Sequence, residues 1–367
     1  MSRSLWALLS ETQKPILMYG MGDGADKALS ICAHLGIRIS GFIASDDFVR
    51  GQSFHDKPVL TLSQARTLHG PDFIILVTFA TALPDVIDHI RTISAEQPLL
   101  IPDIPVFGDE YFSEAVLERD RQKIGEARGL LSDDLSRRLF DSVLAYRMSG
   151  SLSDLEAHTS SKEEVYASLP VHRYRFVVDL GAYTGDSIRE WLSAGFPIAS
   201  VVALEPDPGS FARLCAYLDT LPSIRKEPVQ AAAWSGSAEL VFDANSRGNR
   251  NACLLENYHS AVRPRKTRSR IVRAVSLDTL LGESRPDFIK MDIEGSEEQA
   301  LLGASHLLAT GRPDLQIAVY HRPADLYTLP LLIQSLSKGD YEMYLRRFPC
   351  IPAWDLNLFC VRRQDAL

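Results

Sequence analysis

Short apolar runs alternate with helix-like segments along almost the whole chain of 367 residues. Strand-like runs that are separated in this way by helices build α/β layers in which the strands pair in parallel. At roughly 150 residues per domain, the length indicates two domains. We expect a Rossmann-like domain over 1–112, a helical connector over 113–170 and a second doubly wound domain over 171–367. The charge-rich connector, with apolar residues at helical spacing, needs no catalytic role.

The first unit opens with KPILMYGMGDGADK, a strand-like run followed by closely spaced glycines. Gly20, Gly22 and Ala25 fit the G-x-G-x-x-A pattern of a dinucleotide-binding turn. One such fingerprint leaves two interpretations open, namely a nucleotide site or a docking domain that binds no nucleotide. Further strands are predicted in IRISGFIASDD and PDFIILVTFA.

The second unit begins with RYRFVVDLGAYTGDS, where Asp179 ends a strand and Gly181 and Gly185 flank a turn. Glycines let the backbone approach a ligand closely, and the following helix offers free N–H groups. An acid ahead of the turn would repel a pyrophosphate, but it suits a cationic ligand such as S-adenosylmethionine. The alternative is a plain tight turn.

The next strand, in SVVALEPDP, ends in Glu205. A carboxylate at this place can accept hydrogen bonds from both ribose hydroxyls of a nucleoside. The alternative is a solvated loop acid, which is the usual state of a glutamate. The two stretches together favour a nucleoside ligand.

The stretch DFIKMDIEGSEEQALLGA places Asp292 and Glu294 directly after a buried strand. We expect this strand to lie beside the first strand of the unit, so that Asp292 faces the reactive end of the ligand. Both acids suit acid–base work or the binding of a divalent cation. Alternatively, Glu294 and Gly295 only begin the helix predicted over 296–308, where an acid is favoured by the helix dipole.

His321 follows the next strand, in DLQIAVYHRPADL, and is expected at the same sheet edge as Asp292. Because histidine titrates near neutral pH, His321 is a candidate base, although a structural histidine at a strand end is the alternative. Asp292, Glu294 and His321 are also standard ligand types for one divalent metal ion. Their spacing is not diagnostic of a metal site, and we favour a metal-free base.

Four stretches together resemble the FkbM family of S-adenosylmethionine-dependent methyltransferases, namely FVVDLGAYTGDS, ALEPDP, VSLDTLL and DFIKMDIEGSEEQALLGA. The resemblance covers roughly residues 174–362 and implies a class I methyltransferase fold, with a mostly parallel sheet and an antiparallel C-terminal strand. It also implies O-methylation of a hydroxyl, commonly on sugars or polyketide-like products. It assigns cofactor contacts to Asp179, Gly181, Ala182, Tyr183, Gly185 and Glu205, and the acidic post-strand motif to Asp292 and Glu294. The chain departs from the family in having Tyr183 where asparagine is usual.

The stretch RPRKTRSRIVR carries six basic residues and no acid. Arginine binds phosphate or carboxylate in a bidentate manner, so Arg265 and Arg268 are predicted to recognise an anionic acceptor such as a sugar phosphate. The alternative is a solvated loop or strand face.

The composition restricts the partners of the chain. A net charge of −8 gives no general affinity for nucleic acid. Five scattered cysteines without paired spacing indicate reduced thiols in a cytoplasmic chain and no zinc site. We expect no signal peptide, and no apolar run reaches the about 20 residues of a membrane-spanning helix. The expected partner is a small-molecule or glycan acceptor, and a homo-oligomer is left open.

Two other functions remain open at this point. An NAD-dependent sugar-modifying oxidoreductase could use the N-terminal glycines, but it needs a proton relay that the sequence does not reveal. A non-catalytic protein could retain the nucleoside pocket as a sensor of S-adenosylmethionine.

Overall fold

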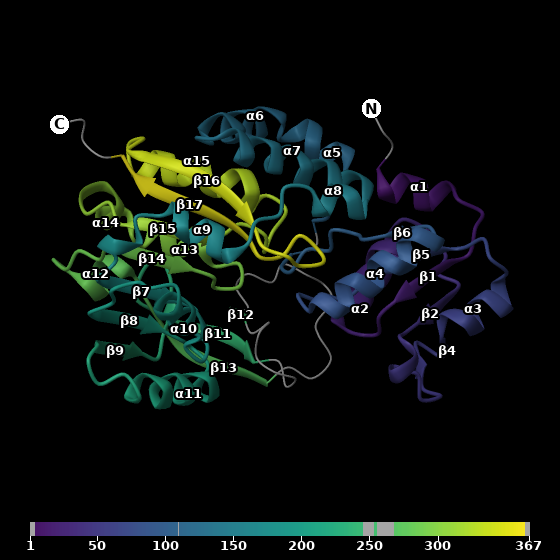
Figure 1. The fold of residues 1–367 in the computed structure, drawn as a ribbon, viewed down its shortest axis with the longest axis horizontal. Helices are drawn as coiled ribbons and strands as arrows, with labels where there is room; N and C mark the ends of the chain where they lie inside the picture. The colour runs from purple at the N-terminus through teal and green to yellow at the C-terminus, as the bar shows by residue number, and fades with distance from the viewer. Residues whose placement is uncertain (1–3, 109, 245–252, 255–267, 364–367) are drawn as a thin grey trace.

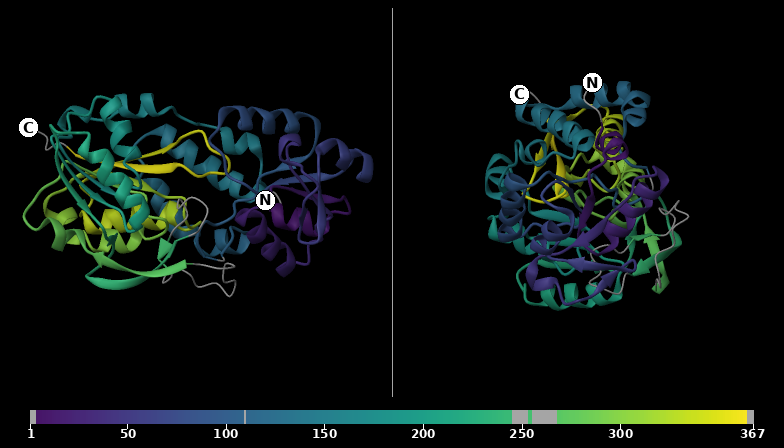
Figure 2. Two further views of the ribbon diagram at one scale, coloured as in Figure 1. Left: turned by 90° about the horizontal axis from the view of Figure 1, so that it is seen from below. Right: turned by 90° about the vertical axis from the view of Figure 1, so that its right-hand side faces the viewer.

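The computed structural model describes residues 4–108, 110–244, 253–254 and 268–363. Two α/β parts lie side by side along the long axis of the molecule, and this arrangement is also seen from below (Figures 1 and 2). The chain forms the N-terminal part first, then a run of helices, and then the larger C-terminal part. Among the described residues, none of the helices is long and apolar enough to cross a membrane.

The N-terminal part is built on a twisted sheet. Its strands are β1 Ile16–Tyr19, β2 Gly41–Ile43, β3 Ser53–Phe54, β4 Lys57–Leu60, β5 Ile74–Val77 and β6 Leu99–Leu100. Its helices are α1 Leu5–Glu11, α2 Asp23–His34, η1 Asp46–Phe48, α3 Leu62–His69 and α4 Pro84–Glu96. The described strands follow the order β3-β4-β2-β1-β5-β6, and β1 pairs in parallel with both β2 and β5. The carboxyl ends of β1 and β5 therefore form the edge where a doubly wound sheet binds ligands.

A run of helices connects the two parts. They are α5 Glu114–Arg119, α6 Arg121–Leu130, α7 Asp134–Ser149, α8 Leu152–Glu156, α9 Lys162–Ser168 and the short η2 Val171–Arg173. Helix α7 buries an apolar stripe that includes Leu139 and Val143. The buried Arg147 on this helix lies 3.0 Å from Asp103 of the N-terminal part and donates to the carbonyl of Pro323 in the C-terminal part at 2.6 Å. This arginine therefore ties the two parts together.

The C-terminal part holds a larger sheet. Its strands are β7 Phe176–Leu180, β8 Ser200–Leu204, β9 Arg225–Val229, β14 Phe288–Met291, β15 Asp314–Ala318, β16 Tyr341–Arg347 and β17 Leu356–Arg362. Their order is β16-β17-β15-β14-β7-β8-β9. Strands β7, β8, β9, β14 and β15 pair in parallel, whereas β17 is antiparallel to both β15 and β16. The predicted class of fold, including the position of β14 beside β7, is confirmed.

The helices of the C-terminal part cover this sheet. They are α10 Asp186–Ser193, α11 Pro208–Asp219, α12 Leu277–Leu281, α13 Glu297–Leu302, α14 Ser305–Thr310 and α15 Asp325–Leu336. The prediction of one helix over 296–308 is wrong, because the chain breaks between α13 and α14. A Cβ atom at Gly303 would lie 2.0 Å from the carbonyl oxygen of Trp234, so the backbone packs directly on a neighbouring segment at this break.

A smaller sheet flanks the C-terminal part. Its strands are β10 Ala232–Ala233, β11 Ala238–Ala244, β12 Cys253–Leu254 and β13 Arg268–Val275. Strands β11 and β13 pair in antiparallel, with Leu240 opposite Val272.

Backbone contacts join the N-terminal and C-terminal parts beside the edges of both sheets. The amide of Phe107 donates to the carbonyl of His321 at 3.0 Å, and Thr81 forms a bridge with Ile351. A Cβ atom at Gly295 would lie 2.8 Å from the ring of Phe107. The ligand edge of the first sheet therefore lies close to the carboxyl edge of the second.

Candidate functional site

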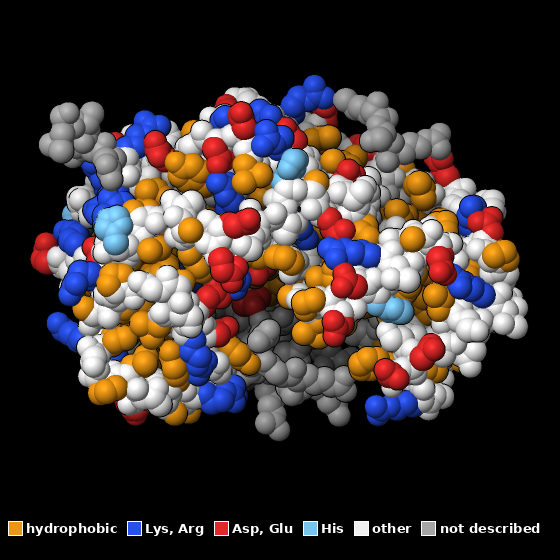
Figure 3. Space-filling view, viewed as in Figure 1, with side chains coloured by type: hydrophobic (Ala, Val, Ile, Leu, Met, Phe, Trp, Pro, Cys, Tyr) orange, Lys and Arg blue, Asp and Glu red, His pale blue; other side chains and the backbone are white. Residues whose placement is uncertain are grey.

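A cavity of about 730 Å³ lies between the two parts. Its walls come from the loop after β1 and the segment after β5 in the N-terminal part, and from the carboxyl ends of β7, β8, β14 and β15 in the C-terminal part. Acidic side chains gather around the hollow between the two parts in the space-filling view (Figure 3). The cavity is in the usual range of roughly 300–1,000 Å³ for small-molecule sites.

The turn after β7 forms one wall of the cavity. Gly181 and Gly185 have φ angles of 78° and 85°, and Tyr183 between them also has a positive φ of 47°. The amides of Gly181 and Ala182 donate to the carbonyl of Leu204 at 3.1 and 2.9 Å, which fixes the turn against β8. Gly181 and Tyr183 line the cavity, as the sequence predicts for a cofactor loop.

Gly181 also packs directly against the acidic motif after β14. A Cβ atom at Gly181 would lie 2.0 Å from the carbonyl oxygen of Asp292, a distance that no side chain can adopt. The amide of Asp292 donates to the carbonyl of Leu180 at 3.2 Å. The glycine turn and the acidic motif are therefore held in one fixed arrangement.

Glu205 lies at the end of β8 with its carboxylate at the cavity. Its two oxygens accept hydrogen bonds from the amide of Tyr183 at 2.9 Å and the amide of Asp207 at 2.8 Å. Burial raises the pKa of Glu205 to about 7, although these two amide donors oppose the shift. The predicted ribose acid therefore faces the cavity in a fixed orientation.

Asp179 does not line the cavity, and its side chain is fully buried beneath the glycine turn. Its Oδ1 lies 3.4 Å from the ammonium group of Lys290, whereas no hydrogen bond reaches its Oδ2. Burial raises the pKa of Asp179 to about 6, and the nearby Lys290 limits that rise. Asp179, predicted to contact a cofactor directly, is therefore not on the cavity wall, whereas its partner Lys290 is.

Asp292 and Glu294 follow β14 on a tight turn and both line the cavity. Glu294 has a left-handed φ of 57° and Gly295 one of 88°, which bends the chain between the two acids and α13. The hydroxyl of Tyr320 donates to Oδ1 of Asp292 at 3.3 Å. Glu294 makes no cap of α13, whose N-cap residue is Ser296, and its carboxylate faces His321 instead.

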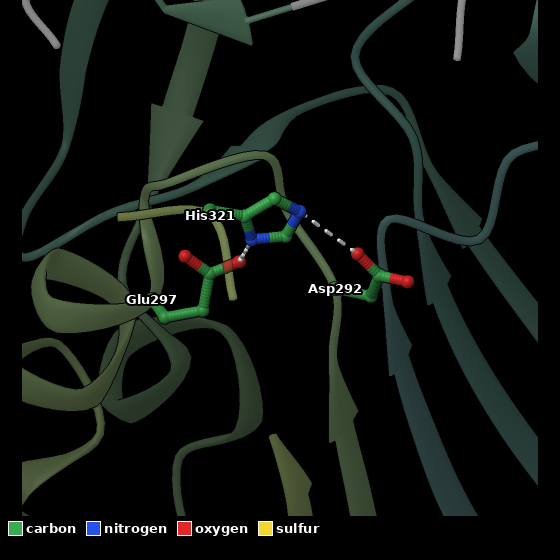
Figure 4. A group of neighbouring side chains, drawn as sticks. All are labelled: Asp292, Glu297 and His321. Carbon is green, nitrogen blue, oxygen red and sulfur yellow. Dashed lines mark ion pairs between the residues drawn. The ribbon is translucent and has the colours of Figure 1, made fainter. Parts of the chain in front are cut away.

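His321 lies between acidic side chains and is fully buried (Figure 4). Its Nδ1 lies 2.9 Å from Oε1 of Glu297, whereas its Nε2 lies 3.4 Å from Oδ1 of Asp292 and 3.7 Å from Oε2 of Glu294. Burial lowers the pKa of His321, but the surrounding carboxylates, first Glu297, outweigh it and raise the pKa to about 10. For the carboxyl group of Glu294 burial acts in the other direction and raises the pKa to about 8.

The predicted triad of Asp292, Glu294 and His321 is therefore brought together, and a fourth member is added. Glu297 is buried in the first turn of α13, where its Oε1 also accepts a hydrogen bond from the amide of Ile293 at 2.9 Å. The sequence EGSEEQ shows this acid, but its position at a helix start made it look like an ordinary dipole-favoured residue.

A second polar group on the cavity wall was not predicted from the sequence. Gln316 on β15 donates to the side chain of Asn357 on β17 at 3.1 Å, and Asn357 donates to Asp355 at 3.0 Å. Trp354 also lines the cavity, and no hydrogen bond reaches its buried indole nitrogen.

The two arginines predicted to bind the acceptor cannot be placed at the cavity. Arg265 lies outside the described residues, and for Arg268 the structure describes only the backbone, which pairs with Ala244. Their neighbour Arg270 lies 3.5 Å from the buried carboxylate of Asp207. One residue of this basic stretch therefore forms an ion pair within the protein.

Comparisons with known proteins agree with this geometry. Residues 179–343 match the family model described as the methyltransferase FkbM domain. The structure of the methyltransferase FkbM from Methylobacillus flagellatus KT superposes with a TM-score of 0.68 and 21% identity, over 95% of this chain and 90% of that chain. The fold of both parts is therefore shared with that protein. No match was found among curated proteins.

Two further solved structures align less closely. Fibrillarin from Aeropyrum pernix, in complex with natively bound S-adenosyl-L-methionine, has a TM-score of 0.30 and 14% identity over 53% of this chain and 69% of that chain. The methyltransferase PaMTH1 from Podospora anserina, with bound S-adenosylhomocysteine, has a TM-score of 0.30 and 13% identity over 70% of this chain and 98% of that chain. The family match thus covers residues 179–343, and the likeness to the Methylobacillus flagellatus structure shows a shared fold.

Proposed function

We propose that the chain transfers a methyl group from S-adenosylmethionine to a hydroxyl oxygen of a polyhydroxylated acceptor, such as a sugar or glycan. One observation carries this proposal. In the FkbM domain, the glycine turn, Glu205 and the acidic motif with Asp292 open onto one cavity at the carboxyl edge of the sheet. This edge is where open α/β sheets bind their ligands.

The residues at this edge fit the cofactor. Glu205 holds its two oxygens at the cavity with a lone pair left on each, and it can accept the two ribose hydroxyls of the nucleoside. Asp186, in the first turn of α10, and Asp292 both line the cavity and favour a sulfonium cation there. The cofactor supplies an electrophilic methyl group, and the residues of the chain have to bind it, orient it and exclude water.

The transfer requires one proton acceptor. As the acceptor oxygen forms its bond to the methyl carbon, the bond from that carbon to sulfur breaks and the sulfonium becomes a neutral thioether. The hydroxyl proton has to leave in the same reaction. Asp292 is placed to take this proton, because its carboxylate lines the cavity and keeps 36% of its side chain exposed.

His321 has a positioning role in this scheme. The sequence makes it a candidate base, with a structural histidine as the alternative, and its side chain is fully buried and does not line the cavity. A general base has to come within hydrogen-bond distance of the proton that it removes. His321 instead supports the acidic motif from behind, together with Glu297 on its other nitrogen.

The wall around Trp354 supports a polyhydroxylated acceptor. Asp355, Asn357 and Gln316 offer carboxylate and amide groups, and the aromatic side chains of Trp354 and Phe348 lie on the same cavity. Aromatic faces beside a few fixed polar groups suit the alternating apolar and hydroxyl faces of a sugar. Seven Asp and Glu residues against three Lys residues line the described cavity, which favours a neutral or cationic acceptor. An anionic acceptor bound by Arg265 and Arg268 stays a prediction of the sequence.

The N-terminal part closes the cavity opposite the methyltransferase residues, through Gly22, Asp23 and the segment after β5. We assign it a role in enclosing the acceptor rather than in binding a dinucleotide. Asp23 and Asp26 occupy the first turn of α2, where a pyrophosphate would have to bind. Like charges at this position disfavour an anionic ligand.

Calorimetric titration of the purified chain with S-adenosylhomocysteine and with NAD tests this proposal. We expect binding of the homocysteine nucleoside, its loss in Glu205→Ala, and unchanged binding in Glu227→Ala, an exposed control on the neighbouring strand β9. An acceptor panel with methyl-labelled S-adenosylmethionine should then show transfer to a hydroxyl that depends on Asp292. Tight binding of NAD without binding of the nucleoside would contradict the proposal.

A further inference from the structure

The Nε2 atom of His321 has no hydrogen-bond partner among the described residues, although the ring is fully buried. It faces Oδ1 of Asp292 at 3.4 Å and Oε2 of Glu294 at 3.7 Å, too far for a direct hydrogen bond with either acid. Ligands that bind a tetrahedral divalent ion at about 2.1 Å lie about 3.4 Å from one another. The distances from Nε2 to these two carboxylate oxygens are therefore close to the edge length of such a coordination sphere.

We propose that Asp292, Glu294 and His321 bind one divalent first-row transition-metal ion at the wall of the cavity. The ion would lie between Nε2 and the two carboxylates, on the side of the imidazole that faces the cavity. This site deepens the function proposed above, and only its catalytic use rests on that function. The binding itself rests on the geometry of the three side chains.

Glu297 would orient the histidine without binding the ion. Asp292, Glu297 and His321 offer atoms within 4.8 Å of one another, and they form the metal-capable group found among the described residues. Glu297, however, approaches Nδ1 at 2.9 Å, on the opposite side of the ring from Asp292 (Figure 4). A carboxylate on the second nitrogen holds a proton at Nδ1, so that metal binding would displace the proton from Nε2.

The backbone holds Glu294 in place for this role. Its φ of 57° is rare for a residue with a side chain and persists only where the surroundings impose it. The conformation brings the carboxylates of Asp292 and Glu294 to the same histidine, although the two residues are separated by one position. An ordinary helix start would direct Glu294 along α13 instead.

The charge balance also favours a cation. Three carboxylates, from Asp292, Glu294 and Glu297, surround a single imidazole. In the described part of the chain, no Lys or Arg forms an ion pair with any of these acids. Two lysines act on these acids from a distance and are paired elsewhere. Lys27 lies 3.1 Å from Asp23, and Lys290 lies 3.4 Å from Asp179.

The ligand set indicates the class of metal. Imidazole nitrogen suits Mn²⁺, Fe²⁺, Co²⁺ or Zn²⁺, whereas Mg²⁺ and Ca²⁺ prefer oxygen ligands throughout. A transition-metal ion next to Asp292 would lower the pKa of an acceptor hydroxyl by acting as a Lewis acid. That effect would assist the proton transfer for which Asp292 is placed.

Titration of the EDTA-treated full chain with Co²⁺ tests the site, because the visible absorption of Co²⁺ reports its ligands. Calorimetry of the same titration gives the stoichiometry and the affinity. We expect one Co²⁺ per chain, with binding lost in Asp292→Asn. We also expect an affinity lowered by about 10- to 100-fold in Glu297→Gln, as is typical when the group behind a metal-binding histidine is altered.

Glu298→Gln is the matched control, because Glu298 is exposed and lies next to Glu297 on α13. It should bind Co²⁺ like the wild-type chain, and thermal melts should show each variant folded. Absence of binding, binding that Asp292→Asn leaves unchanged, or ready displacement of Co²⁺ by an equal amount of Mg²⁺ would each overturn the inference. A chain that binds S-adenosylhomocysteine but does not bind Co²⁺ would overturn this inference alone. A chain that binds Co²⁺ but does not bind the nucleoside would overturn the proposed function alone.

Discussion

Gly181→Ala should damage both the fold and the cofactor site, and Gly195→Ala provides a matched control. Both glycines have left-handed φ angles, 78° and 83°. The space around them differs, since a Cβ atom at Gly181 would lie 2.0 Å from the carbonyl oxygen of Asp292, whereas Gly195 has no atom within 4 Å. The control therefore carries the backbone strain without the steric conflict.

The magnitudes follow from this difference. Left-handed strain costs both alanine variants about 1–2 kcal/mol. The conflict at Gly181 is with a backbone oxygen, which cannot move aside as a side chain can, and it should add about 1–3 kcal/mol. In a domain of this size each kcal/mol lowers Tm by about 2–4 °C, so Gly181→Ala should melt clearly below Gly195→Ala.

Thermal melts and calorimetry with S-adenosylhomocysteine measure the two effects. Relief of the conflict has to separate the glycine turn from the acidic motif, so Gly181→Ala should bind the nucleoside roughly tenfold or more weakly, which is about 1.4 kcal/mol. Gly195→Ala should bind it like the wild-type chain. Equal Tm and equal affinity in the two variants would refute the claim that the turn and the motif are held in one arrangement.

Three further predictions concern the same site. Burial raises the pKa of Glu205 to about 7, and under the proposed function its ionised form would accept the ribose hydroxyls. Affinity for S-adenosylhomocysteine should therefore rise between pH 6 and pH 8, and Glu205→Gln should remove that rise in a calorimetric pH series. Asp292→Asn should lower kcat of methyl transfer by about 10²–10⁴ while the nucleoside affinity stays unchanged, and an unchanged kcat would exclude Asp292 as the proton acceptor. A Cβ atom at Gly295 would lie 2.8 Å from the ring of Phe107, so Gly295→Ala should lower Tm, and Phe107→Ala in that background should recover part of the loss. Additive losses in the double variant would contradict this contact.

The sequence predicted the parts of the site that local rules determine. Glu205 and Asp292 each follow a buried strand, and the carboxyl ends of parallel strands meet at one edge, so their proximity needed no knowledge of the packing. Strand β4 was missed because DKPVL offers a lysine and a proline where a buried strand usually shows an apolar run. The break between α13 and α14 was missed because it depends on the contact of Gly303 with Trp234, about 70 residues earlier in the chain.

The role of His321 shows where sequence reasoning ends. Its place near Asp292 follows from the strand order, but its burial comes from residues that the strand pattern cannot connect. Phe107 of the N-terminal part donates its amide to the carbonyl of His321, and their ring centroids lie 6.1 Å apart. Glu297, on α13, lies 2.9 Å from the Nδ1 atom of His321.

The contact of Phe107 with His321 also bears on why the two parts belong together. The segment that carries Phe107 packs on Gly295 within the acidic turn, so the N-terminal part helps to bury the histidine that supports Asp292. A methyltransferase domain that lost this segment would expose His321 to water and free the acidic turn to move. Exposure would weaken every electrostatic contact among His321, Glu294 and Glu297, because water screens charges far more strongly than the protein interior does. The N-terminal part therefore acts on the geometry of the acidic turn as well as on the shape of the cavity.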